Sequence, residues 1–177
     1  MKLIRYGLLL AGLYAAAVQA QPSALQIRIQ RLGSLRYNNV NDLGWNGWAL
    51  QVEKSHSAPN GLGWLAGAEM GYTGWGSQVL AKGGVQYQLT KSSRWLSSVR
   101  AYVMPGAALF RPRPLFTYRV GGEVVGAYKL GKRFGLMAAA GIAYAACPAY
   151  DRYGSINRYV DVPLSVGVLF TASQTAR

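Results

Sequence analysis

The sequence predicts an all-β protein: a closed antiparallel transmembrane β-barrel of about eight strands, preceded by a cleaved signal peptide. Apolar residues recur at every second position along most of the chain, which is the period of a strand with two different faces. Clusters rich in Gly, Pro, Asn and Ser separate these runs and indicate turns. The N-terminal residues are patterned differently and indicate export.

The first 20 residues have the three regions of a secretory signal peptide. Lys2 and Arg5 supply a positive start, residues 8–18 are apolar, and the small side chain of Ala20 suits a cleavage point. The apolar run is about a dozen residues, shorter than the roughly 20 that a membrane-spanning helix requires. We therefore expect a signal peptide at residues 1–20 and one outer-membrane β-barrel domain at residues 21–177.

The chain is strongly basic. Its 19 Lys and Arg residues against 6 Asp and Glu give a formal net charge of +13, and loss of Lys2 and Arg5 with the signal peptide lowers this to +11. Such an excess favours anionic partners. For an exported protein these are lipid phosphates, and nucleic acid is not expected. The single Cys147 excludes an internal disulfide, and we expect no metal and no cofactor because one histidine and one cysteine supply too few ligands for a zinc site.

The alternating runs predict eight strands joined by connections of two lengths. The predicted strands cover residues 24–32, 46–54, 62–73, 78–90, 95–105, 115–130, 134–147 and 157–171. Residues 91–94 and 131–133 are tight turns, whereas 34–45, 106–114 and 148–156 are long. Short turns on one rim and long loops on the other are typical of an outer-membrane barrel. Residues 55–61 are long for a short-turn rim, and 74–77 are short for a long-loop rim.

The two faces of these strands differ in chemistry. One face is apolar, and we assign no charge to it. The other face combines many Gly and Ala residues with charges, five basic and four acidic. Those charged residues are Arg28, Glu53, Glu69, Lys82, Arg100, Arg119, Glu123, Lys129 and Asp161. A soluble barrel of the lipocalin kind would turn the apolar face inward, whereas a membrane barrel turns it toward lipid.

Three features favour the membrane arrangement. Gly and Ala suit the narrow interior of an eight-stranded barrel, and the nearly balanced charges suit an enclosed interior because buried charges must be paired. Aromatic residues gather near the predicted strand ends, as they do at the two lipid–water interfaces of membrane barrels. These are Trp45, Trp48, Trp64, Trp75, Trp95, Phe116, Tyr118, Tyr128, Phe134, Tyr144, Tyr159 and Phe170.

The final predicted strand, residues 159–170, alternates regularly and ends in the aromatic Phe170. It looks like the terminal signal that the barrel-assembly machinery reads, although Thr171–Arg177 follow it. With this strand, the chain after the signal peptide resembles the small outer-membrane barrels of Gram-negative bacteria, of the OmpA/OmpX class, and the generic barrel domains of Bacteroidetes. It is more distantly similar to the TraO-type barrel proteins of conjugation systems. The resemblance implies an outer-membrane location, with membrane lipid, lipopolysaccharide and the assembly machinery as partners.

The polar face supplies the main candidate site, a network of ion pairs in the lumen across neighbouring strands. The expected pairs join Glu53, Glu69 and Glu123 to Lys82, Arg100 and Arg119. Such pairs either plug the barrel as structural elements or open a small pore by exchanging partners. A second candidate is the basic stretch 111–114, where Arg111 and Arg113 offer planar guanidinium donors to a phosphate.

No catalytic motif emerges from the sequence. The only histidine, His56, lies between Ser55 and Ser57, but adjacent positions point apart in a strand, and we expect a solvated turn there. We therefore expect a non-enzymatic outer-membrane barrel with a structural or surface-interaction role. The alternatives are a narrow or gated pore, an envelope lipid-modifying enzyme, and a soluble ligand-binding β-barrel.

Overall fold

The computed structural model describes residues 23–35, 43–73, 76–92, 94–109, 113–149 and 158–171. The predicted signal peptide lies outside these ranges. The described residues form eight strands: β1 (Ser23–Leu35), β2 (Leu43–Ser57), β3 (Leu62–Thr73), β4 (Gly76–Lys91), β5 (Trp95–Ala108), β6 (Leu115–Lys129), β7 (Phe134–Ala146) and β8 (Arg158–Thr171). No helix among the described residues is long and apolar enough to cross a membrane.

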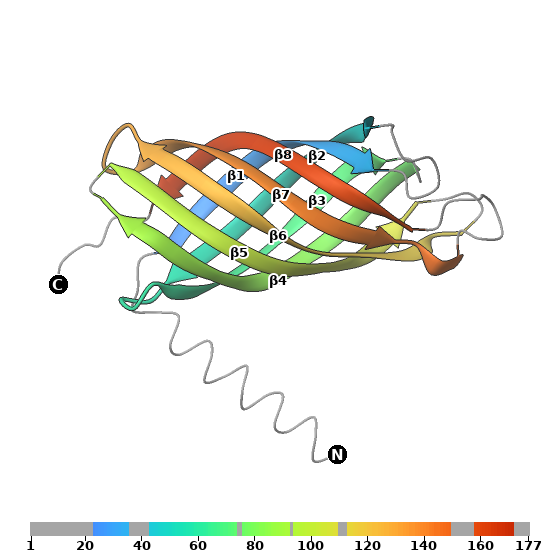
Figure 1. The fold of residues 1–177 in the computed structure, drawn as a ribbon, viewed down its shortest axis with the longest axis horizontal. Coiled ribbons are helices and arrows are strands. Elements are labelled where there is room, and N and C mark those ends of the chain that lie inside the picture. The colour runs from blue at the N-terminus through green and yellow to red at the C-terminus, as the bar shows by residue number, and fades with distance from the viewer. Residues whose placement is uncertain are drawn as a thin grey trace, which may run out of the picture.

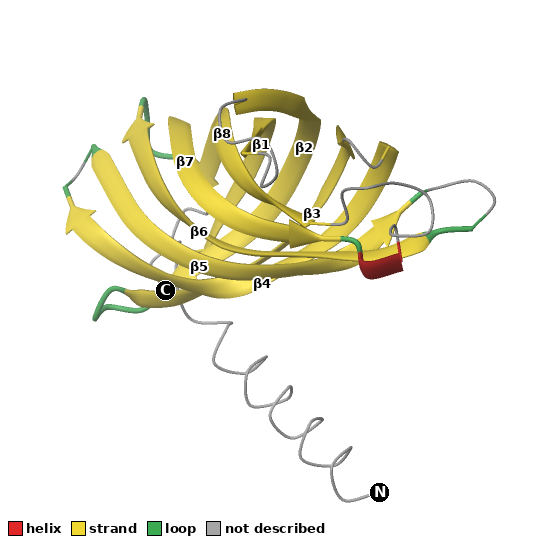
Figure 2. Ribbon diagram, turned by 45° about the vertical axis from the view of Figure 1, so that its right-hand side comes forward, coloured by secondary structure: helices red, strands yellow, loops and turns green. Residues whose placement is uncertain are grey.

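The eight strands close into one antiparallel barrel in sequence order (Figure 1). Closure is made by β1 and β8, which pair from Ala24 opposite Thr171 to Leu35 opposite Val160. The strands slant across the barrel axis (Figure 2), as closure of a small barrel requires. Because every strand has two hydrogen-bonded neighbours, the sheet has no open edge, and this is the condition for spanning lipid with strands.

Short and long connections lie on opposite rims, as the sequence predicts. The structure also explains the two connections whose predicted lengths did not fit, residues 55–61 and 74–77. Strand β2 continues to Ser57, so its connection to β3 is a tight turn in which the Gly61 amide donates to the Ala58 carbonyl at 2.9 Å. The φ of Gly61 is +90°, a conformation that favours glycine. On the opposite rim, β3 ends at Thr73 and β4 begins at Gly76, so one connection of the long-loop rim is short.

The apolar face points outward. Large apolar side chains on the outer wall are widely exposed, including Trp48 at 59% and Val166 at 64%, while the charged face fills the interior. The soluble alternative, with its apolar face inside, is therefore wrong. The expectation of a charge-free outer face is also wrong at three positions: Arg31, Lys54 and Arg158 point outward. Lys54 and Arg158 lie toward the ends of their strands, and the guanidinium carbon of Arg31 lies 5.6 Å from the centre of the Trp48 ring.

Outward aromatic rings form two belts. At the short-turn end the rings of Trp95 and Tyr128 lie 5.2 Å apart, and those of Phe134 and Phe170 lie 5.8 Å apart. At the long-loop end, Phe116, Tyr118 and Tyr144 make a similar series. Amphipathic rings favour the lipid–water interfaces. Tyr159 was expected in a belt, but its side chain faces the lumen and is buried, because strand alternation places it on the inner face with Asp161.

Glycines on the inner face make room for the strands and for their charged neighbours. A Cβ added at Gly167 would lie 2.1 Å from the Ile27 carbonyl oxygen and 2.8 Å from Cα of Arg28. Gly67 and Gly141 stand in the same way opposite Glu53 and Glu123. The abundance of small residues thus reflects both the narrow lumen and the close approach of neighbouring strands beside each large charged side chain.

We predict that Gly167→Ala destabilises the barrel by about 1–3 kcal/mol, the usual cost of overpacking, because the new methyl group meets backbone. The measurement is the urea concentration at the midpoint of unfolding in detergent. Unfolding is monitored on an unheated gel by the loss of the mobility that is characteristic of the folded barrel. Gly126→Ala is the matched control, because a Cβ at Gly126 has no heavy atom within 4 Å. Equal midpoints for the two variants would contradict this account of the inner glycines.

Candidate functional site in the barrel lumen

The lumen contains charged side chains at mid-height, arranged in two clusters one above the other. We call them the lower ion cluster, nearer the short turns, and the upper ion cluster, nearer the long loops. The lower ion cluster consists of Arg28, Lys82, Arg100, Glu53 and Glu123. The upper ion cluster consists of Arg119, Glu69 and Asp161. All eight side chains are at most 4% exposed.

In the lower ion cluster, each carboxylate is shared by three cations. Arg28 donates to Glu53 at 2.9 Å and to Glu123 at 3.0 Å. Lys82 lies 3.0 Å from Glu53 and 2.9 Å from Glu123, and Arg100 also bonds both. Shared charge-assisted bonds of this kind offset the large cost of removing charges from water. The cluster therefore ties β1, β2, β4, β5 and β6 together through the interior.

In the upper ion cluster, one cation serves two carboxylates. Arg119 Nη1 lies 2.8 Å from Glu69 Oε1, and Arg119 Nε lies 3.2 Å from Asp161 Oδ2. Gln30 and Gln78 donate to the Glu69 carboxylate at 3.4 and 3.3 Å. These contacts join β6 to β3 and β8, and amides from β1 and β4 complete the layer.

The structure brings all six predicted network residues into the lumen and adds Arg28 and Asp161. Strand alternation already places Arg28 and Asp161 on the charged face, so their position in the lumen could be predicted from the sequence. The expected pairing across neighbouring strands is incomplete. Only the Arg28–Glu53 and Arg100–Glu123 bridges join adjacent strands; the other bridges cross the lumen. In a barrel this narrow, long side chains reach the opposite wall as easily as the next strand.

Beyond the upper ion cluster, toward the long loops, most of the buried side chains are apolar. Ala108, Leu115, Ala145, Cys147 and Tyr159 form a buried cluster at the long-loop ends of β5 to β8. Cys147, the single cysteine of the chain, is buried and packs here as a small apolar side chain. The interior is thus filled at mid-height by charge and near one end by packed apolar groups.

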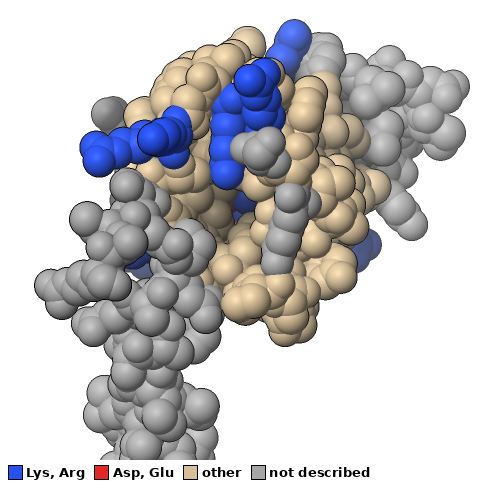
Figure 3. Space-filling view, turned by 90° about the vertical axis from the view of Figure 1, so that its left-hand side faces the viewer, with Lys and Arg blue, Asp and Glu red and all other residues tan. Residues whose placement is uncertain are grey.

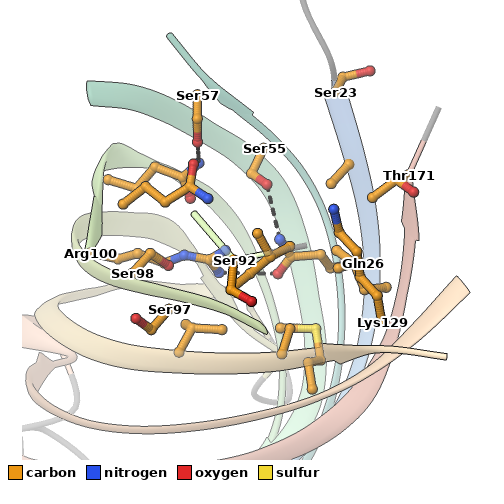
Figure 4. A pocket seen from close by; sticks show the side chains of 18 of the residues that line it. Ser23, Gln26, Ser55, Ser57, Ser92, Ser97, Ser98, Arg100, Lys129 and Thr171 are labelled. Carbon is orange, nitrogen blue, oxygen red and sulfur yellow. Dashed lines mark hydrogen bonds between the residues drawn. The ribbon is translucent and has the colours of Figure 1, made fainter. Parts of the chain in front are cut away.

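Toward the short turns the lumen opens into a cavity of about 640 Å³, which we call the vestibule. Figure 4 shows its side chains. Gln26 donates to the Ser55 hydroxyl at 2.9 Å, and Gln86 donates to the Ser57 hydroxyl at 2.7 Å. Arg100 lines the vestibule and donates to Gln26 at 3.1 Å. Arg100 thus belongs to the vestibule wall and to the lower ion cluster together.

The rim around the vestibule is basic. Figure 3 looks at this end and shows Lys and Arg side chains around a hollow, with no Asp or Glu visible among the coloured atoms. The basic residues of the described short-turn end are Lys54, Arg94, Lys129, Lys132 and Arg133. Lys129, predicted on the charged inner face, lines the vestibule and stands apart from both ion clusters.

Two other predicted features lie elsewhere. His56 is not in a solvated turn: it lies within β2, is buried, and its ring centre is 5.9 Å from that of Trp64. The turn was misplaced because β2 runs three residues further than the apolar alternation indicated. Arg113 is exposed at the long-loop rim, and Arg111 lies outside the described residues. Among the described residues, no three His, Cys, Asp or Glu side chains gather as a metal site.

Comparisons with known proteins support the fold. No protein-family model and no curated protein matches the chain. Among solved structures, neisserial surface protein A (NspA) matches with a TM-score of 0.57 and 13% identity, covering 84% of this chain and 96% of that one. The attachment invasion locus protein Ail of Yersinia pestis matches with a TM-score of 0.49 and 8% identity, covering 86% and 99%.

The likeness to NspA shows a shared fold, the closed eight-stranded barrel of small outer-membrane proteins. The outer wall of this chain adds its own evidence, because an apolar band between two aromatic belts is the surface that a lipid bilayer requires. The chain is therefore a β-barrel protein of the outer membrane.

We predict that Arg119→Ala lowers the free energy of unfolding by about 3–5 kcal/mol, because it leaves two buried carboxylates without their cation. Arg100→Ala costs less, since Arg28 and Lys82 still contact both carboxylates of the lower ion cluster. The urea midpoint in detergent measures both, with Arg113→Ala as the exposed control. Unchanged midpoints for Arg119→Ala and Arg100→Ala together would rule out a structural network.

Proposed function

We propose that this chain, an eight-stranded barrel of the outer membrane, is a non-enzymatic protein that presents its long connections at the cell surface on a rigid, sealed barrel. Export through a signal peptide at residues 1–20 and insertion by the barrel-assembly machinery belong to the same proposal. The observation that carries it is the filled lumen, where two ion clusters and an apolar cluster occupy successive levels.

The same observation weighs against the pore. A conducting path through the lower ion cluster would have to separate Arg28 from Glu123, whose bond crosses between β1 and β6. Breaking a buried pair costs several kcal/mol because each charge is left without compensation. A partner switch inside the lower ion cluster would also leave the upper ion cluster and the apolar cluster in place.

An exposed arginine at the long-loop rim supports contact with anionic groups at the cell surface. Arg113 is exposed there, and outer-membrane barrels carry their long loops on the extracellular side. A guanidinium binds phosphate through two parallel hydrogen bonds. Arg113, with Arg111 beside it in sequence, is thus suited to the phosphates of lipopolysaccharide, and the apolar outer wall is suited to its acyl chains.

The geometry around His56 favours a non-enzymatic role. A serine-type site requires a hydroxyl within hydrogen-bond reach of a base. Here the Ser55 and Ser57 hydroxyls accept from Gln26 and Gln86 on the lumen side. The His56 ring instead packs against Trp64. Strand β2 therefore directs the histidine ring and the two serine hydroxyls to opposite faces.

We predict that the purified folded barrel does not conduct ions across a planar lipid bilayer, because two ion clusters and an apolar cluster close its interior beyond the vestibule. Insertion is verified in the same preparation by the mobility shift between unheated and boiled samples. Sustained, reproducible current steps from the wild-type barrel would contradict the sealed-barrel proposal and favour a pore.

A further inference from the structure

The vestibule has no part in the function proposed above, yet it has the dimensions of a binding site. Its volume of about 640 Å³ lies within the roughly 300–1,000 Å³ of small-molecule pockets. It is a blind pocket rather than a passage, because Arg100 in its wall also belongs to the lower ion cluster. A molecule entering from the short-turn end would stop at that cluster.

Buried charge makes the inner end of the vestibule positive. The lower ion cluster holds three cations, Arg28, Lys82 and Arg100, against two carboxylates, Glu53 and Glu123. The upper ion cluster has the opposite excess, one cation against two carboxylates, and lies further from the vestibule. A surplus charge surrounded by protein is poorly screened, so the pocket attracts anions from its closed end.

Basic residues at the mouth of the vestibule add to the positive potential of its inner end. Lys129 lines the cavity, and the backbone oxygens of Lys132 and Arg133 bind Thr171, another lining residue, at 2.9 and 3.0 Å. The described short turns contain no Asp or Glu. A cleft lined by one sign of charge concentrates oppositely charged ligands, and Figure 3 shows this basic rim around the hollow.

The wall from β1, β2 and β4, together with Arg100 of β5, supplies hydrogen-bond donors. A hydroxyl has one hydrogen to donate and two lone pairs. Because Ser55 and Ser57 accept from Gln26 and Gln86, each hydroxyl keeps its own hydrogen to donate. Arg100 is 4% exposed, and its Nε makes no hydrogen bond within the described chain. Figure 4 shows these polar side chains gathered around the vestibule.

The opposite wall of the vestibule is apolar. Leu96, Val125, Met137 and Leu169, from β5 to β8, line it with apolar side chains. A ligand that fills the vestibule must therefore combine a negative group, several hydroxyls and one apolar face. A pyranose ring with a phosphate has this combination, because its C–H groups form an apolar face and its hydroxyls lie around the ring edge.

We propose that the vestibule is a binding site for a small phosphorylated sugar that enters from the short-turn side. The phosphate lies between Lys129 at the mouth and the positive inner end, where charge-assisted hydrogen bonds are strongest. The sugar hydroxyls bond the Ser55, Ser57 and Gln86 wall, and the C–H face packs against the apolar wall. This site is at the opposite end of the barrel from the proposed surface contact and is independent of it.

The test is isothermal titration calorimetry on the full barrel, folded in an uncharged detergent that carries no sugar headgroup. Three probes separate the parts of the proposal: glucose 6-phosphate, glucose and inorganic phosphate. We expect saturable binding of glucose 6-phosphate at one site, with each of the other two at least about tenfold weaker, because each lacks one set of bonds. Glucose binding as tight as glucose 6-phosphate would overturn the anionic assignment, and phosphate binding as tight would overturn the sugar assignment.

Variants locate the site without disturbing the ion clusters. Lys129→Gln and Ser57→Ala are expected to weaken binding of glucose 6-phosphate by about tenfold or more and about threefold or more, respectively, the first losing a charged donor and the second a neutral one. Arg158→Gln, exposed at the long-loop end of β8, is the control and is expected to bind normally. The same mobility difference between unheated and boiled samples as in the wild type shows that each variant is folded. No saturable binding in the wild type, or equal loss in all three variants, would overturn the proposal.

Discussion

Eight buried charges determine how this barrel is built. Four cations and four carboxylates lie in an interior too narrow for bulk water, and each would cost several kcal/mol if left alone. Their mutual bonds connect strands that are distant in sequence, such as Arg28 on β1 and Glu123 on β6. The ion clusters therefore fix the interior of a sheet whose outer face contributes little specificity, because lipid contacts any apolar side chain in much the same way.

The other features of the lumen follow from accommodating those charges. Inner-face glycines stand opposite Arg28, Glu53 and Glu123 and admit the stems of these long side chains between closely paired strands. The charges are also unevenly divided, with a positive surplus toward the vestibule and a negative surplus toward the long loops. The barrel is thus electrically polar along its axis, and its two rims present different chemistry.

Local sequence patterns predicted the fold well because a period of two directly records which face each residue occupies. Alternation identified all eight strands and placed Arg28 and Asp161 on the charged face. It did not predict which charges would meet, since pairing across the lumen depends on strand tilt and on the register of closure. It also misplaced the end of β2, where the polar run Ser55, His56, Ser57 resembles a turn but continues the strand. Arg31, Lys54 and Arg158 were missed because apolar neighbours dominate the outer face of their strands. Arg31 is accommodated there beside the Trp48 ring.

A double-mutant cycle between Arg28 and Glu123 tests the central claim most directly. The free energy of unfolding in detergent is measured for Arg28→Ala, Glu123→Ala and the double variant, against the wild type. If cross-lumen pairing holds the barrel, the two losses are non-additive, with a coupling energy of about 0.5–3 kcal/mol. Losses that add within about 0.5 kcal/mol would show that the two charges act independently, and the ion clusters would then not be what holds the interior together.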